Sequence, residues 1–174
     1  MTMGPTPSSG PARSPVEPPP LPEVLEARRE RRLAAGLAVA GVAVFSIASL
    51  LNPYDASGTP RRCGTHRQLG LPACPLERLT GVGCPSCGMT TAFSLLTHGD
   101  PAAAWQTNWA GCVVAGLTFL GTIWFVLVAL GRPPGRFTAD EVVKIIAFTG
   151  MGTAIVRWLA TLGYSAIGAA FRAG

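Results

Sequence analysis

Two cysteines three positions apart, Cys84 and Cys87, form the motif C-P-S-C near the middle of the chain. Two thiols at this spacing can bind a metal ion, exchange disulfides or cross-link a fold. Cys63 and Cys74 lie in the same loop, and His66 follows Cys63 at C-x-x-H spacing. Because disulfides persist only in oxidising compartments, the chemistry open to these thiols depends on the side of a membrane on which the loop lies.

The composition indicates that lipid is the solvent for much of the chain. Of its 174 residues, 48% are hydrophobic and only 13% are charged, which is about half the charged share of an ordinary soluble domain. The net charge of +5 comes mostly from arginines that flank apolar runs. This pattern favours contact with anionic lipid headgroups over nucleic-acid binding.

Three apolar runs are long enough to cross a bilayer. Residues 33–51 would form a helix roughly 28 Å long, close to the ~30 Å of a hydrocarbon core. This run is too long for a cleaved signal peptide and no A-x-A site follows it, so we expect an uncleaved anchor. Further spans are predicted at 109–130 and 142–162. The expected fold is an all-α integral membrane protein with three transmembrane helices.

These features predict a division of the chain into six parts. They are a disordered Pro-rich cytoplasmic tail at 1–27, a basic flank with the first transmembrane helix at 28–51, a Cys-rich loop at 52–104, the second transmembrane helix at 105–130, a short basic loop at 131–141, and the third transmembrane helix with a C-terminal tail at 142–174.

The distribution of basic residues predicts the topology. Four arginines crowd 28–32, and Arg132, Arg136 and Lys144 flank the hairpin between the second and third spans, whereas the four arginines of 52–104 are spread over a much longer stretch. The positive-inside rule therefore places the N-terminus in the cytoplasm and the Cys-rich loop outside, in a multi-pass protein of the plasma (bacterial inner) membrane.

A short interfacial helix is expected directly after the C-P-S-C motif. Pro85 suits the first turn of a helix, and 88–97 has a broad apolar face but is too short to span. His98-Gly99 supplies a stop. Asp100-Pro101 then reads as an N-cap followed by proline at the first helical position, and Asn108 as a residue that bonds between helices.

Several short motifs, in order and at matching spacing, resemble the bacterial membrane family called domain of unknown function 2752. The residues that carry the resemblance are Cys74, Pro75, Leu79, Thr80, Gly81, Cys84, Pro85, Ser86, Cys87, Gly88, Gly99, Asp100 and Asn108. The family often has Gly between the paired cysteines, T-R after the glycine, and Pro after the Asn. This chain has Ser86, Thr90-Thr91 and Trp109 there. The resemblance implies an integral membrane protein and brings no established activity.

Three interpretations of the loop thiols remain open. Cys63, Cys74, Cys84 and Cys87 could form two disulfides that hold a cap outside the membrane. Cys84 and Cys87 could instead join Cys63 or Cys74, with His66 as a further candidate ligand, around a tetrahedral zinc ion. In the third interpretation Cys84 and Cys87 are a thiol–disulfide exchange site, with a thiol pKa lowered by the following helix. That layout is similar to membrane thiol oxidoreductases related to vitamin K epoxide reductase.

The remaining polar and aromatic residues indicate anchoring rather than catalysis. Trp105, Trp109, Arg157 and Trp158 are expected at membrane interfaces, and Lys144 lies near a helix end, where its side chain can snorkel. No nucleophile–His–acid set or phosphate loop is present in the sequence. We therefore expect a structural, accessory or partner-binding membrane protein with a cysteine-stabilised extracytoplasmic cap. Its expected partners are lipid, another membrane protein or a second copy. No cofactor is expected unless the cysteines bind zinc.

Overall fold

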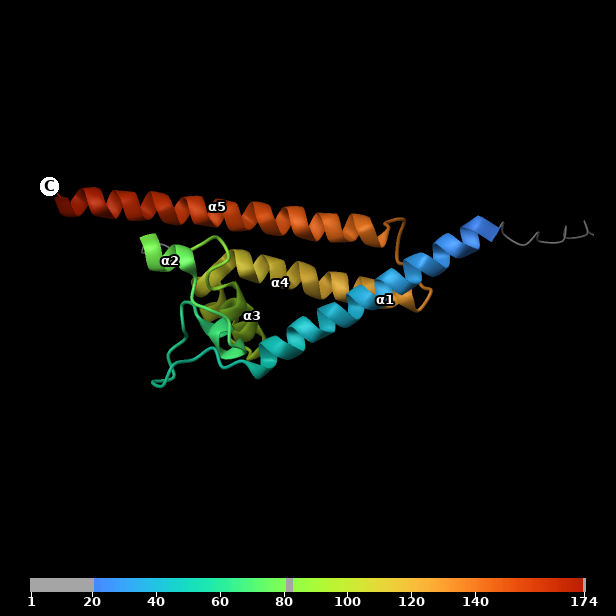
Figure 1. Ribbon diagram of the computed structural model, residues 1–174, viewed down its shortest axis with the longest axis horizontal. Coiled ribbons are helices and arrows are strands. Elements are labelled where there is room, and N and C mark those ends of the chain that lie inside the picture. The colour runs from blue at the N-terminus through green and yellow to red at the C-terminus, as the bar shows by residue number, and fades with distance from the viewer. Residues whose placement is uncertain (1–20, 81–82, 174) are drawn as a thin grey trace, which may run out of the picture.

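A computed structural model gives the structure of the protein, describing residues 21–80 and 83–173, with residues 165–173 described by their backbone alone. This part of the chain is helical and contains no strand, which confirms the expected all-α class (Figure 1). The elements are α1 (Leu21–Leu50), the 3₁₀ helix η1 (Thr65–Leu69), α2 (Pro75–Thr80), α3 (Met89–Thr97), α4 (Pro101–Ala129) and α5 (Ala139–Ala173).

Three of these helices can cross a membrane by length and composition. They are α1, α4 and the part of α5 from Ala139 to Tyr164, as the apolar runs predicted. Large apolar side chains cover their outer faces: Leu50 is 85% exposed and Phe148 is 77% exposed. Surfaces of this kind require a hydrocarbon solvent, which supports lipid contact along all three helices.

The first helix is longer than its apolar run. α1 begins at Leu21, so residues 21–27, expected as the end of the tail, are helical together with the basic cluster. The segment 23–32 contains only Glu, Val, Leu, Ala and Arg, and most of these residues favour helix and continue the hydrogen-bond ladder of the span. The expected disordered tail at residues 1–20 lies outside the described residues.

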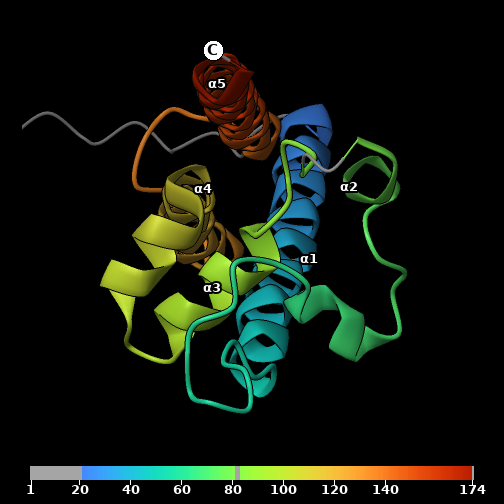
Figure 2. The same cartoon turned by 90° about the vertical axis from the view of Figure 1, so that its left-hand side faces the viewer.

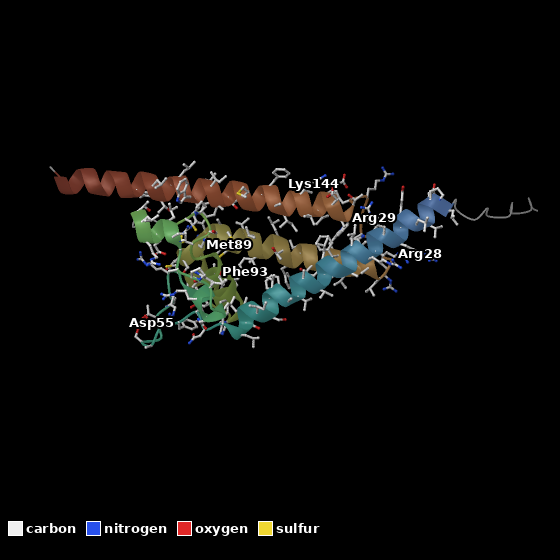
Figure 3. The ribbon with its side chains drawn as sticks, in the orientation of Figure 1. Arg28, Arg29, Asp55, Met89, Phe93 and Lys144 are labelled. Carbon is white, nitrogen blue, oxygen red and sulfur yellow. The ribbon has the colours of Figure 1, made fainter. Side chains whose placement is uncertain are left out.

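Helix α4 occupies the centre of the molecule. It packs against α1, α3 and α5, whereas α1 and α5 contact each other only slightly. α5 runs alongside α4, and α1 crosses α4 at an angle (Figure 1). The loop, α2 and α3 gather at one end of the three long helices (Figure 2). Arg28 and Arg29 lie at the opposite end from Asp55 of the loop (Figure 3).

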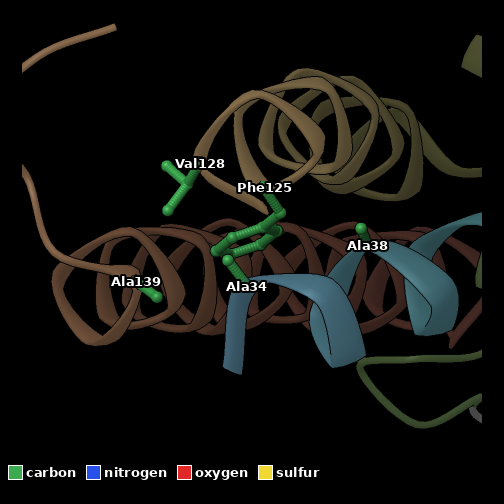
Figure 4. Packing of buried hydrophobic residues seen from close by; sticks show 5 residues of the cluster. All are labelled: Ala34, Ala38, Phe125, Val128 and Ala139. Carbon is green, nitrogen blue, oxygen red and sulfur yellow. The ribbon is translucent and has the colours of Figure 1, made fainter. Parts of the chain in front are cut away.

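Buried apolar side chains, three of them alanines, hold the three long helices together at the end of the bundle near Arg28. A cluster of buried residues joins α1, α4 and the first residue of α5 (Figure 4); it consists of Ala34, Ala38, Phe125, Val128 and Ala139. A Glu30 carboxylate oxygen accepts the backbone N–H of Ala139. The basic segment of α1 therefore also caps the start of α5.

Aromatic rings hold the end near the loop. Phe45 of α1 stacks on Phe93 of α3, with ring centroids 5.8 Å apart, and meets Phe119 of α4 edge to face at 5.9 Å. Ala48 and Ala115 are buried beside them. The short helix α3 is thus clamped between α1 and α4, and this fixes the base on which the cysteine loop rests.

Gly41 provides a test of the α1–α4 contact. A Cβ at this position would stand 2.1 Å from Thr122 Oγ1 of α4, whereas a Cβ at Gly36 in the same helix would meet nothing within 4 Å. We expect Gly41→Ala to destabilise the folded protein by about 1–3 kcal/mol through overpacking. Thermal unfolding in detergent should show a lower midpoint for Gly41→Ala, and Gly36→Ala should match the wild type. Equal midpoints for the two variants would contradict this packing.

Candidate functional site

The loop that carries the cysteines is fixed to α3 by buried hydroxyl groups. Thr65 Oγ1 and Thr91 Oγ1 lie 2.9 Å apart, and both side chains are fully buried. Ser94 Oγ donates to the backbone oxygen of Leu51 at 2.7 Å, at the point where α1 ends. Thr91 thus serves the packing of η1 on α3.

Helix α4 is broken at Asn108. This residue has φ −158° and ψ 91° inside an otherwise helical segment. Its Oδ1 accepts the N–H of Gly111 at 2.9 Å, as an N-cap does, so a new helix starts there. The carbonyl oxygen of Thr107, just before the break, accepts Arg157 Nη2 of α5 at 3.0 Å. The sequence indicated an Asn that bonds between helices but did not reveal the break.

The same asparagine holds the cysteine motif. Asn108 is fully buried, and its Nδ2 donates to the backbone oxygen of Cys87 at 3.0 Å. Next to Cys87, Gly88 has φ +82°, and a Cβ there would stand 2.7 Å from Arg62 O. Residue 88 therefore has to be glycine, because a side chain would meet both a strained backbone and a clash.

The C-P-S-C residues form a separate turn rather than the start of a helix. The Cys87 N–H donates to Cys84 O at 2.9 Å, and α3 begins only at Met89, after the left-handed Gly88. The expectation that Pro85 opens the helix is wrong, because the positive φ of Gly88 separates the turn from α3. Both thiols consequently lie ahead of the helix and face the loop.

Three sulfur atoms converge at this turn. The Sγ atoms of Cys74, Cys84 and Cys87 all lie within 4.8 Å of one another, and those of Cys84 and Cys87 are 3.4 Å apart. The Cys84 N–H donates to Cys87 Sγ at 3.2 Å. The three side chains are half-buried. They come from the start of α2 and from the turn before α3, two segments brought together by the loop.

The other two candidate ligands lie beside this group. Cys63 Sγ donates to Glu77 Oε1 at 3.4 Å, and His66 Nε2 lies 3.2 Å from the Pro72 carbonyl oxygen. Both residues line a second pocket together with Cys74 and Glu77. The expected clustering of four loop cysteines is therefore realised by three thiols that converge, with the fourth turned toward a carboxylate that sequence reasoning did not single out.

Backbone hydrogen bonds make the Cys74 thiol more acidic than an ordinary cysteine. The N–H groups of Glu77 and Cys84 donate to its sulfur, which lowers the pKa of Cys74 from 9.0 to about 7. Cys74 precedes Pro75, the first residue of α2, so its sulfur sits at the N-terminal end of that helix. Hydrogen bonds from backbone amides stabilise a thiolate, the form that binds metal ions and attacks disulfides.

The pKa of the Cys87 thiol is shifted in the opposite direction. Burial raises the pKa of its thiol to about 12, and hydrogen bonding with Cys84 and Cys74 adds to the effect. Burial also raises the pKa of Cys63, with Glu77 as a second cause. The low thiol pKa that we expected within the Cys84–Cys87 pair is therefore found at Cys74, which lies ten residues earlier and accepts two backbone N–H groups.

No disulfide joins the cysteines. All five are free thiols, and the Cys84–Cys87 sulfur distance of 3.4 Å exceeds the ~2.05 Å of a disulfide bond. The two disulfides expected for a cap are therefore not formed in this structure. The fifth cysteine, Cys112 of α4, is half-buried beside Ala92, Leu95 and Ala104.

A cavity of about 470 Å³ opens beside the paired thiols. Cys63, Glu77, Cys84 and Cys87 form part of its lining, and Arg157 and Trp158 of α5 form another part. Trp158 Nε1 donates to the backbone oxygen of Gly83 at 3.1 Å. We had expected both α5 residues to serve as interfacial anchors, but their side chains turn inward and connect α5 to α4 and to the cysteine turn.

The other motif residues shape the chain. Pro75 begins α2, and the Thr80 hydroxyl at its end donates to Leu76 O. Gly99 has φ +79° after α3, and Asp100 Oδ1 accepts the Ala103 N–H ahead of Pro101, as the sequence indicated. Gly81 lies outside the described residues. Trp105 and Trp109 pair with ring centroids 6.4 Å apart, and Trp105 is 58% exposed.

Residues 74–124 match the family described as "Protein of unknown function (DUF2752)". The matched region contains the three converging cysteines, α3 and Asn108, and it confirms the resemblance that the motifs suggested. No curated protein and no solved structure matches the chain. Because the family description names no activity, function has to be argued from the geometry of the site.

Asn108 provides a test of this arrangement. Asn108→Ala would leave the Cys87 carbonyl and the Gly111 N–H without their buried partners, at about 1–3 kcal/mol each. We expect a clearly lower unfolding midpoint in detergent, and an intermediate one for Asn108→Asp, which keeps the acceptor but loses the donor. Gln106→Ala, at an exposed position two residues earlier, is the matched control. A midpoint for Asn108→Ala equal to that of the control would show that the break needs no side-chain support.

Proposed function

We propose that this protein is a small multi-pass membrane protein whose loop forms a cap held together by a metal ion, with zinc as the best-fitting metal. The observation that carries this proposal is the convergence of the Cys74, Cys84 and Cys87 sulfurs within 4.8 Å. Sulfurs bound at ~2.3 Å around a tetrahedral ion stand roughly 3.8 Å apart. The group therefore has the size of a thiolate metal site before any ion is considered.

The chemistry of the donors fits the same conclusion. Cys74 ionises near neutral pH, and a bound divalent ion deprotonates the other thiols. Amide N–H groups directed at Cys74 and Cys87 resemble the outer hydrogen bonds that orient thiolate ligands. Three sulfurs leave one tetrahedral position for a fourth ligand. Cys63 is the remaining loop cysteine, and its thiol bonds to Glu77, three residues after Cys74.

A metal ion would replace the disulfides as the cross-link of the cap. The segment from Asn52 to Gly88 has few buried apolar side chains, with Thr65 its main buried polar one. A structural zinc ion contributes its binding free energy to folding. It also protects neighbouring thiols from oxidation in a compartment where free cysteines would pair. We propose a structural or accessory role for this cap rather than an enzymatic one.

Metal analysis of the full-length protein tests the proposal. We expect about one zinc ion per chain in protein purified in detergent without chelators. Cys74→Ser, Cys84→Ser or Cys87→Ser should each lose the ion and lower the unfolding midpoint, because each removes a ligand. Cys112→Ser, in α4, is the matched control and should keep the zinc ion and the unfolding midpoint of the wild type.

Two results would contradict the metal proposal. One is a wild-type protein without zinc whose stability does not respond to a chelator. The other is metal loss in Cys112→Ser equal to that in the three ligand variants. Cys63→Ser identifies the fourth ligand: loss of the ion assigns that position to Cys63, and retention assigns it to water or another donor.

Thiol–disulfide exchange is the second candidate, and one observation favours it. The Cys84 and Cys87 sulfurs are only 3.4 Å apart beside an open cavity. In exchange with a substrate disulfide, the two thiols would become a disulfide and the substrate would leave as two thiols. This function requires zinc-free protein that reduces an added disulfide, with the activity lost in Cys84→Ser while the fold is kept.

The basic residues support a topology in which the cap is extracytoplasmic. Arg28 and Arg29 lie at the end of the bundle opposite the cap (Figure 3), and the positive-inside rule keeps such a cluster in the cytoplasm. We therefore propose a location in the bacterial inner membrane with the N-terminus inside. Reporter fusions after Gly58 and after Gly135 should give opposite signals, the first extracytoplasmic. A cytoplasmic signal after Gly58 would reverse the orientation.

A further inference from the structure

The cavity of about 470 Å³ beside the cysteine turn has features that the metal proposal does not use. Two arginines, Arg62 and Arg157, line it, and Glu77 is the one acidic residue of the lining. These three charged residues give the lining one net positive charge. Its volume falls in the range of roughly 300–1,000 Å³ that is usual for ligand pockets, and is larger than a single ion needs.

Arg157 is an unusual residue for its place in the fold. It lies within the part of α5 that can span a membrane, and its side chain turns inward to Thr107 O instead of outward. Within 21–80 and 83–164 the one ion pair is Lys144 with Asp140, so neither Arg157 nor Arg62 is matched by a carboxylate. An ionised group that turns into the interior of a membrane protein marks a functional site by default.

The remaining donors of the two arginines point to the chemistry of the ligand. A guanidinium group has five N–H donors, and Arg157 uses one of them on Thr107 O. Planar, multidentate donors of this kind suit the oxygen atoms of a phosphate group. The cavity lies between the first turns of α4, the segment of α5 around Arg157 and the Cys-rich loop.

From these observations we propose that the cavity binds a phosphate group through Arg62 and Arg157, with the headgroup of an anionic lipid and free phosphate as its two sources. Trp158, whose indole N–H donates to Gly83 O, forms part of the cavity wall beside Arg157. A bound phosphate would bridge α5 and the loop, because Arg157 belongs to the one and Arg62 to the other. This site does not require the metal ion, since neither arginine is a metal ligand.

The test measures binding to the full-length protein, in a neutral detergent, as a rise in its thermal unfolding midpoint. The probes are dioctanoyl phosphatidylglycerol, inorganic phosphate, and dioctanoylglycerol, which has the same acyl chains and no phosphate. We expect phosphatidylglycerol to stabilise the protein and dioctanoylglycerol to have no effect. Stabilisation by inorganic phosphate as well would assign the site to free phosphate, and its failure to stabilise would assign it to the lipid.

Three variants separate this site from general charge effects. Arg62→Gln should weaken the apparent affinity for the phosphate probe about tenfold, through the loss of one charge-assisted contact. Its side chain is exposed and has no structural bond, so the fold should be unaffected. Arg157→Gln should weaken binding similarly, but it also removes the bond to Thr107. Arg67→Gln, in the same loop and outside this cavity, is the matched control and should bind as the wild type.

Equal stabilisation by phosphatidylglycerol and dioctanoylglycerol would overturn the proposal. Equal affinities of Arg62→Gln and Arg67→Gln would do the same. A third contradicting result is that Arg62→Gln changes the alkylation rate of the cysteines but does not change phosphate binding. The arginines would then stabilise the thiolates and would not bind phosphate. Repeating the titration with Cys74→Ser keeps the two proposals distinguishable: retained phosphate binding in zinc-free protein supports this site even where the metal site is lost.

Discussion

A backbone break inside a membrane helix has to be repaired, and the rest of this structure depends on how α4 repairs the one at Asn108. Buried carbonyl and N–H groups cost free energy unless they are paired, so each has to find a partner within the protein. Asn108 Oδ1 accepts a hydrogen bond from the Gly111 N–H, and the Arg157 guanidinium group donates one to the Thr107 carbonyl oxygen. The same break turns Asn108 Nδ2 toward Cys87 O. One irregular residue thus connects α4, α5 and the cysteine turn.

This connection explains how a loop with little apolar surface holds three thiols in place. Asn108 of α4 donates a hydrogen bond to the last residue of the turn from Cys84 to Cys87. Trp158 of α5 donates one to Gly83, just before the turn. Cys74 reaches the turn through α2 and meets the Cys84 amide. The sulfurs converge because separate backbone contacts fix each segment. A metal ion bound there would join α2 to the turn, and a phosphate in the neighbouring cavity would join the loop to α5.

The sequence predicted the parts that follow from length, periodicity and local chain chemistry. Long apolar runs indicated three spanning helices, and Asp100-Pro101 indicated the start of α4. The family resemblance was recognisable from short motifs. The break at Asn108 was not predicted, because the polar segment Gln106-Thr107-Asn108 contains none of the Pro or Gly residues that usually mark a break in a helix. The inward turn of Arg157 and the role of Glu77 depend on contacts 50 and 14 residues away along the chain. The disulfide interpretation rested on the number of loop cysteines and on the compartment, and neither reveals which groups surround a thiol.

The central claim is that Cys74, Cys84 and Cys87 together bind one metal ion, and the local structure around the metal tests it most directly. Zinc K-edge X-ray absorption of the full-length protein in detergent should show at least three sulfur scatterers at ~2.3 Å. A shell of only nitrogen and oxygen scatterers, or one with a single sulfur, would contradict the account, since the converging thiols would then not be the ligands.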